Sequence, residues 1–279
     1  MQEDKTGQQS TLKKWLIQQL QKVKQKTPNE LVIDLSIFSI QNALLRIAES
    51  LDNWNYLFTL NVKLPKNKIA CSEVKNLVKS LQKYHSVSNL SLIFNCFQID
   101  EDTTFMIGKA ISSSSNIQSV NLVLRNKDLD AQKITKFVEG IEVCTRLTQF
   151  TLDLFINPIC QQGALKLADI FTLMPNLIQF KLLLTGCQIG SEGVSQLGKK
   201  ITECRNLQSF SLGLMNNNIN YDGAYNFLSQ LSKLPQLNSF NLNLTANKDL
   251  RCDCLIQLIY KLRRIVKFVS VDKEPYFLN

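Results

Sequence analysis

The side chains that most often carry out chemistry in proteins are scarce in this chain and stand apart from one another. His85 is the only histidine, and no recognisable motif joins it to a nucleophile and an acid. Gly186, Gly190 and Gly193 lie in TGCQIGSEG, which matches neither GxGxxG nor a Walker loop, so we expect tight turns there. The acidic residues 100–102 suit a helix start better than a metal site. We therefore expect no enzyme activity, no catalytic residue, no metal and no cofactor.

The cysteines also lack the spacing of a metal site. None forms a CxxC pair, and a single histidine does not support a zinc site of the usual spacing. We expect them to be reduced and mostly buried, because a thiol packs as a small apolar group. They are Cys71, Cys96, Cys144, Cys160, Cys187, Cys204, Cys252 and Cys254.

The net charge of +9 is concentrated at the two ends of the 279 residues. Residues 1–27 carry six Lys against two acidic residues, and residues 248–279 carry seven basic against four acidic residues. The long middle, 28–247, has 19 basic and 17 acidic residues. Nucleic-acid-binding proteins usually spread Lys and Arg along one face, so this distribution disfavours nucleic acid and favours an acidic protein partner.

No apolar run reaches the roughly 18 residues that cross a bilayer, and the start MQEDKTGQQS is polar. We expect a soluble intracellular protein, cytoplasmic in the first instance, with no membrane span and no small-molecule substrate.

The organisation of the chain follows from apolar residues that recur every 30 residues. The last apolar residue of each strand-like run has apolar residues two and four positions before it, which is the period of a strand with one buried face. The first spacing is 29 and the next six are 30. These markers are Leu35, Leu64, Phe94, Leu124, Leu154, Leu184, Leu214 and Leu244.

Each marker is followed by a helical pattern. After Leu184, apolar or small residues stand at Val194, Leu197, Gly198 and Ile201, which is the i, i+3, i+4, i+7 stripe of an amphipathic helix. One strand–turn–helix unit cannot bury both its strand face and its stripe. Stacked units can, so the sequence predicts a solenoid with a parallel sheet.

These repeats resemble the leucine-rich repeat family, whose signature is LxxLxLxxNxL. The segment from Leu207 to Ile219 carries it, with Asn217 at the signature amide, and the period of 30 is similar to that of the ribonuclease-inhibitor-like subfamily. The resemblance implies an α/β right-handed solenoid, a curved horseshoe of about eight 30-residue repeats plus caps. Its parallel sheet would line the concave side, and its helices the convex side.

The resemblance also implies a buried ladder of turn residues. Its members here are Asn67, Asn157, Cys187, Asn217 and Asn247. Phe97 and Lys127 depart from the pattern, so we expect altered turns at those two places.

Three segments are predicted. Residues 1–27 form a basic amphipathic helix that caps the first repeat or docks on a partner, 28–247 form the solenoid, and 248–279 form a C-terminal capping repeat and tail. A cap is expected at each end because an uncovered sheet edge invites aggregation. Ser112–Ser115 is predicted to be a solvated linker that could be phosphorylated.

The candidate binding residues alternate with the buried strand positions and should face the concave side. Five are apolar although they should be exposed, and Arg125 and Asp153 should flank them. Met, aromatic residues and Arg are enriched at protein interfaces, although Ile and Val also suit any strand. The apolar members are Ile93, Val123, Phe155, Leu183 and Met215.

The sequence thus predicts a non-enzymatic protein-interaction module: a scaffold, an adaptor or a structural subunit that binds a protein on the concave face. Repeat proteins of this subfamily occur in cytoskeletal and ciliary assemblies, so the resemblance implies such a setting. One alternative is a small-GTPase regulator of the Ran-activator type, although those proteins carry an acidic tail. The other is weak binding of nucleic acid or an acidic surface by the basic ends.

Overall fold

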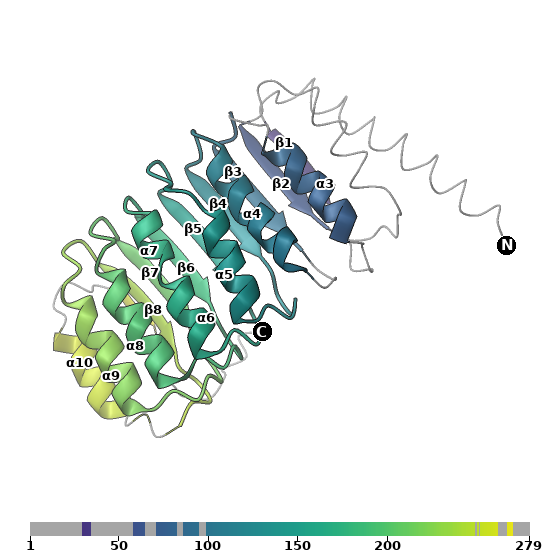
Figure 1. Ribbon diagram of the computed structural model, residues 1–279. Helices are drawn as coiled ribbons and strands as arrows, with labels where there is room; N and C mark the ends of the chain where they lie inside the picture. Colours follow the sequence, from purple (N-terminus) through teal and green to yellow (C-terminus); the bar gives the residue numbers. More distant parts are fainter. Residues whose placement is uncertain are drawn as a thin grey trace.

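The strands lie side by side in the order in which they occur in the sequence, all parallel, in one sheet (Figure 1). The computed structural model describes residues 30–34, 58–64, 71–82, 86–94, 99–248, 250, 252–261 and 267–269. Within these ranges the strands are β1 (Glu30–Asp34), β2 (Thr59–Lys63), β3 (Asn89–Ile93), β4 (Ser119–Val123), β5 (Gln149–Asp153), β6 (Gln179–Leu183), β7 (Ser209–Gly213), β8 (Ser239–Asn243) and β9 (Lys267–Val269). From β2 to β8 each residue pairs with the residue 30 positions later, as Leu122 does with Leu152.

Helices connect the strands and form a layer over one face of the sheet (Figure 1). Asp100, Asp130 and Asn220 cap three of them, each accepting a hydrogen bond from the backbone N–H three residues later. The described helices are α3 (Cys71–Leu81), α4 (Glu101–Ser113), α5 (Ala131–Gly140), α6 (Cys160–Leu167), α7 (Ile170–Leu173), α8 (Gly190–Ile201), α9 (Tyr221–Leu231) and α10 (Cys252–Lys261). The acidic residues at 100–102 therefore begin a helix, as predicted.

This arrangement is the α/β leucine-rich-repeat solenoid that the repeat predicts. Paired strands lie about 4.8 Å apart, whereas packed helices lie about 8–10 Å apart. The stack therefore curves, with the sheet on the concave side and the helices on the convex side. We call the exposed surface of the sheet the strand face. The cap helix predicted for residues 1–27 lies outside the described residues.

The core between the sheet and the helices is aliphatic in the first units and aromatic in the later ones. The first buried strand position is aliphatic in β1 to β4 and Phe in β5 to β8. The rings of Phe150, Phe180, Phe210 and Phe240 follow one another with centroid separations of 5.5, 5.7 and 5.8 Å. Stacked rings at these distances add to the hydrophobic stabilisation, so the later units share a continuous aromatic spine.

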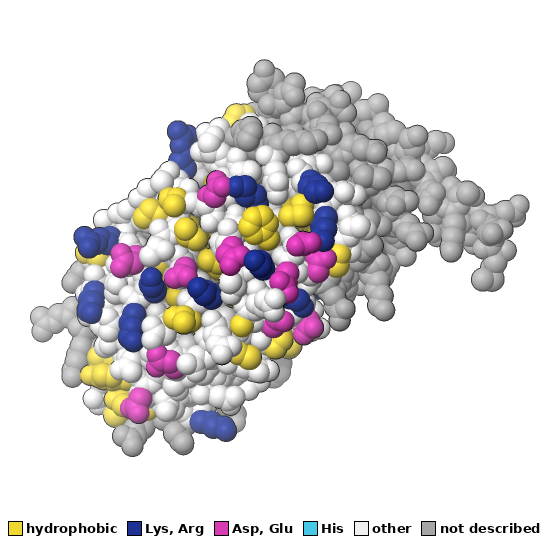
Figure 2. Space-filling view, in the orientation of Figure 1, with side chains coloured by type: hydrophobic (Ala, Val, Ile, Leu, Met, Phe, Trp, Pro, Cys, Tyr) yellow, Lys and Arg dark blue, Asp and Glu magenta, His cyan; other side chains and the backbone are white. Residues whose placement is uncertain are grey.

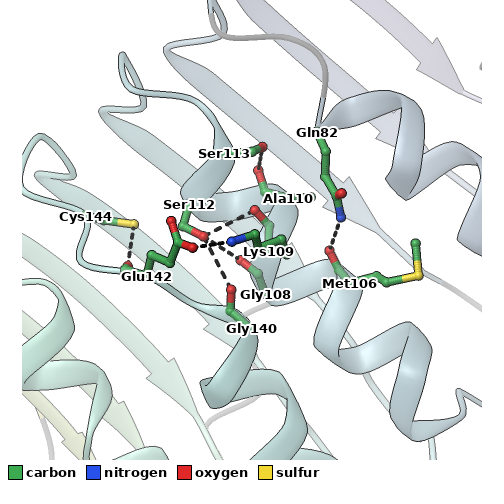
Figure 3. A network of polar contacts seen from close by, with 10 residues as sticks. All are labelled: Gln82, Met106, Gly108, Lys109, Ala110, Ser112, Ser113, Gly140, Glu142 and Cys144. Atoms are coloured by element: carbon green, nitrogen blue, oxygen red, sulfur yellow. Dashed lines mark hydrogen bonds and ion pairs between the residues drawn. The ribbon is translucent and has the colours of Figure 1, made fainter.

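Helices α4 and α5 approach each other closely because glycine stands on both sides of the contact. A Cβ at Gly108 would clash with the carbonyl oxygen of Phe137, and a Cβ at Gly140 would clash with that of Phe105. The Ser112 Oγ lies 3.4 Å from the Gly140 oxygen, so it donates across the contact (Figure 3). This packing explains why two helices can follow the close spacing of the strands.

The same region corrects the prediction of a solvated linker at Ser112–Ser115. Ser112 and Ser113 belong to the last turn of α4, where Ser113 Oγ donates to the Ala110 oxygen at 2.9 Å (Figure 3). Ser114 is buried, and its Oγ donates to the Val87 oxygen at 2.6 Å. A serine hydroxyl can donate to a backbone carbonyl in place of water. A polar run of Ser residues therefore need not be a solvated loop.

The helix side carries charges of both signs mixed with apolar side chains (Figure 2). Ion pairs join neighbouring units. Lys109 of α4 pairs with Glu142, which follows α5 (Figure 3), and Lys200 of α8 lies 3.6 Å from Asp169, which lies between α6 and α7. In the described residues no helix is long and apolar enough to cross a membrane.

Candidate protein-interaction face

The predicted binding residues occupy two adjacent rows at the carboxyl ends of the strands. Ile93, Val123, Asp153 and Leu183 are the last residues of β3 to β6 and pair in that order. Arg125, Phe155 and Met215 lie two residues further along, where the turns begin. The five apolar side chains are each partly exposed, so they form a half-buried apolar patch. We call Ile93, Val123, Phe155, Leu183 and Met215 the strand-face patch.

Arg125 and Asp153 form an ion pair within this patch. The Asp153 carboxylate is almost fully buried, with 3% of the side chain exposed, whereas Arg125 is 59% exposed. Nε of Arg125 donates to Asp153 Oδ2 at 2.6 Å, and the backbone N–H of Phe155 donates to Oδ1 at 3.2 Å. The guanidinium carbon lies 5.9 Å from the centroid of the Phe155 ring. Asp153 was expected at the edge of the patch. It lies instead beneath Arg125, because the side chain of Arg125 covers it.

The side chain of Leu183 occupies space left by a glycine on the next strand. Gly213 pairs with Leu183, and a Cβ on Gly213 would stand 3.0 Å from Cδ2 of Leu183. The Leu183 side chain therefore lies across the position that a larger residue would fill. This arrangement makes Leu183 part of a continuous surface from β6 to β7.

The rest of the strand face is polar and nearly uncharged. Asn89 Nδ2 donates to Thr59 Oγ1 at 3.2 Å, and Asn121 Nδ2 donates to Ser91 Oγ at 3.0 Å, so neighbouring units share hydrogen bonds. At the first and third positions of strands β3 to β8, the only charged residue is Lys181. The first and third positions of those strands are Asn89, Ser91, Ser119, Asn121, Gln149, Thr151, Gln179, Lys181, Ser209, Ser211, Ser239 and Asn241.

The turn ladder holds the strand ends in place. Asn217 is completely buried, and its Oδ1 accepts the N–H groups of Cys187 at 3.0 Å and Ile189 at 3.1 Å. Its Nδ2 donates to the Leu184 oxygen at 2.7 Å. Asn157 and Asn247 repeat this pattern, and the thiol of Cys187 donates to the Leu154 oxygen at 3.1 Å. Each of these four described ladder side chains thus satisfies backbone groups of the preceding unit.

The turn at Lys127 keeps this geometry, contrary to our expectation. Its neighbours Asn126 and Asp128 have φ of 51° and 55°, and Asn216 and Asn218 both have 55°. The backbone N–H of Lys127 donates to Asn157 Oδ1 at 2.8 Å, so the next unit sets the shape of the turn. Asn67 and Phe97 lie outside the described residues.

The candidate catalytic and metal-binding residues come together nowhere in the described part of the chain. His85 lies outside it, and the described residues contain no group of three His, Cys, Asp or Glu able to hold a metal. Gly186 and Gly190 occupy left-handed turn positions with φ of 67° and 69°. Burial raises the pKa of Cys187 and of Cys204 to about 12, which disfavours the reactive thiolate.

Sequence reasoning overlooked Ile156, which adjoins the patch. It is 49% exposed and has φ of 51°, a left-handed conformation that is unfavourable for a β-branched residue. The equivalent residues in the other described turns are Asn126, Gly186, Asn216 and Ala246, all with positive φ. An Ile at a position where these four turns have Asn, Gly or Ala was the signal in the sequence.

No protein-family model and no curated protein matches the sequence. Among solved structures, an internalin from Listeria monocytogenes aligns over 80% of this chain and 70% of its own, with 14% identity and a TM-score of 0.29. The two structures superpose poorly at this TM-score, and the fold follows from the register and packing described above.

Proposed function

We propose that this protein is a non-enzymatic interaction module, a scaffold, adaptor or structural subunit, that holds a protein partner against its strand face. The observation that carries this proposal is the strand-face patch. Leu183, Phe155 and Met215 lie partly exposed on consecutive units, where a strand face without a partner would gain from polar side chains. Burying them against a partner would remove apolar surface from water.

The surroundings of the patch support the same proposal. Arg125, which lies beside the Phe155 ring, still exposes 59% of its side chain. Aromatic residues, Met and Arg are enriched at the centres of protein interfaces, and hydroxyl and amide groups suit their rims. An apolar centre of this composition, with Ser, Thr, Asn and Gln beside it, is typical of a surface that binds another protein.

The charges of the described strand face favour no strongly acidic partner. Arg125 is paired with Asp153, and Lys63 lies 3.3 Å from Asp34. Lys181 remains as an exposed cation, and a single Lys selects only weakly for an acidic partner. Any preference for acidic proteins would come from the terminal segments, 1–27 and 248–279. An intracellular, reducing setting would suit the buried thiols, Cys144, Cys187 and Cys204.

The test places opposite charges in the patch and asks whether partner capture survives. We expect Phe155→Asp with Leu183→Lys to abolish capture measured by affinity purification and mass spectrometry. The matched control makes the same two changes on the helix side, Phe105→Asp with Leu165→Lys, where both side chains are exposed. Circular dichroism should show both variants folded. Equal capture by the patch variant and the wild type would refute the proposal.

A further inference from the structure

An open depression of about 500 Å³ begins where the strand-face patch ends. Its exposed lining comes from the turns that follow β4, β5 and β6, directly after Arg125, Phe155 and Thr185 in the sequence. Ile156 leans over the next unit, since a Cβ on Gly186 would stand 3.5 Å from its Cγ1. We call Asn126, Asp128, Ile156, Pro158, Gly186 and Gln188 the turn-edge site.

Ile156 is doubly unfavourable in the protein alone. Its φ of 51° is costly for a β-branched side chain, and half of that side chain faces water. The same turn position two units later is Asn216, a residue type that adopts left-handed φ readily. Neither turn geometry nor burial in the core explains the choice of Ile. A ligand that covers Ile156 would.

The polar groups around Ile156 fit a peptide backbone better than a charged ligand. Asn126 and Gln188 are exposed carboxamides, which both donate and accept hydrogen bonds, as a peptide group does. The Asp128 carboxylate lies 4.0 Å from Lys133 Nζ, and Arg125 is paired with Asp153. The site therefore offers no unbalanced charge to attract an ion.

We propose that the turn-edge site binds an extended, charge-poor peptide segment of the partner and that Ile156 contacts an aliphatic or aromatic side chain of that segment. This proposal rests on the proposed function and adds the chemistry of the partner. The partner crosses from the strand-face patch to the turns, and its bound segment carries little net charge. Binding is then insensitive to salt, because screening acts on charged groups.

The test selects a displayed library of random linear peptides on the full chain and measures the affinities of the enriched peptides. We expect peptides of low net charge with an apolar residue, whose affinity changes little from low to high salt. Ile156→Asn should weaken them at least about tenfold, equivalent to about 1.4 kcal/mol. The same substitution should raise the melting temperature, because Asn tolerates the left-handed turn. The matched control, Asn216→Gly, should leave affinity unchanged.

Each other outcome overturns the inference in its own way. Unchanged affinity for Ile156→Asn, with loss for Phe155→Asp and Leu183→Lys, would leave the strand face as the binding surface and remove the turn-edge site. Enrichment of acidic peptides whose affinity falls as salt rises would show that the site prefers a charged peptide and would contradict the proposed charge-poor segment. A lack of enriched peptides would rule out a linear segment as the occupant. Failure of the proposed function itself would appear separately, as unchanged partner capture by the patch variant.

Discussion

Asp153 is buried beneath Arg125, and both Nε and Nη2 of Arg125 lie 2.6 Å from its carboxylate oxygen Oδ2. The two residues differ greatly in exposure, with 3% of the Asp153 side chain and 59% of the Arg125 side chain accessible. Loss of the cation would leave a buried carboxylate with a single described donor, the N–H of Phe155. Loss of the anion would leave an arginine that water can solvate. The pair is therefore asymmetric.

We expect Arg125→Ala to lower the free energy of unfolding by about 1–3 kcal/mol, because it strands a buried charge. Asp153→Asn should cost less. The double variant, Arg125→Ala with Asp153→Asn, should recover part of the loss, since no buried charge remains. Urea denaturation followed by circular dichroism measures all three. Equal losses in the two single variants would contradict the asymmetry.

The close approach of α4 and α5 gives a second prediction. Alanine normally stabilises a helix interior by about 1 kcal/mol relative to glycine. At Gly108 we expect the opposite, a loss of about 1–3 kcal/mol, because the new Cβ meets the Phe137 carbonyl on the neighbouring helix. Gln132→Ala on the exposed side of α5 is the control and should change stability little. A more stable Gly108→Ala variant would mean that the helices can move apart freely.

The sequence predicted the register of the sheet because burial repeats with it. Leu122, Leu152 and Leu182 stand 30 residues apart and pair directly, as the spacing requires. The prediction of a helix in each unit came from the same logic. An average pattern of apolar residues thus determines which side of each element faces the core.

Contacts between particular side chains were not predictable in this way. Burial of Asp153 depends on the reach of one arginine from the preceding unit, and Ser114 is buried because a carbonyl of the unit before it accepts its hydroxyl. The helix predicted between β5 and β6 is divided into α6 and α7, which the apolar pattern did not indicate. The apolar period predicts whether a position is buried, but it does not predict which side chain or carbonyl that position contacts.

The turn ladder gives a third prediction, at Asn217. Replacement by Ala would remove the acceptor of two backbone N–H groups and the donor to the Leu184 oxygen, all in the interior. We expect a loss of about 3 kcal/mol or more in the free energy of unfolding.

Asn217→Cys should lose less than Asn217→Ala, because Cys187 shows that a thiol can donate to the ladder carbonyl, there at 3.1 Å. Asn247→Ala should also be milder, since Asn247 is only partly buried. Denaturant unfolding ranks the three variants. An Asn217→Ala variant as stable as the wild type would show that the ladder contributes little.

The buried thiols give a fourth prediction, a loss of stability at alkaline pH. Burial raises the pKa of Cys144 from 9.0 to about 11 and the pKa values of Cys187 and Cys204 to about 12. Above about pH 9 the unfolded chain releases these protons while the folded chain keeps them. The folded state then binds more protons, so its stability falls as pH rises from 9 toward 12.

By about pH 10 each such thiol should account for roughly 1 kcal/mol of the loss, and Cys204→Ala should remove its share. The measurement is the difference between the unfolding free energies at pH 8 and pH 10, compared between variant and wild type so that lysine titration cancels. Cys254→Ala is the control, because Cys254 is exposed. The same pH dependence in Cys204→Ala and the wild type would show that the Cys204 thiol ionises as readily in the folded chain as in the unfolded one. Burial would then not protect it.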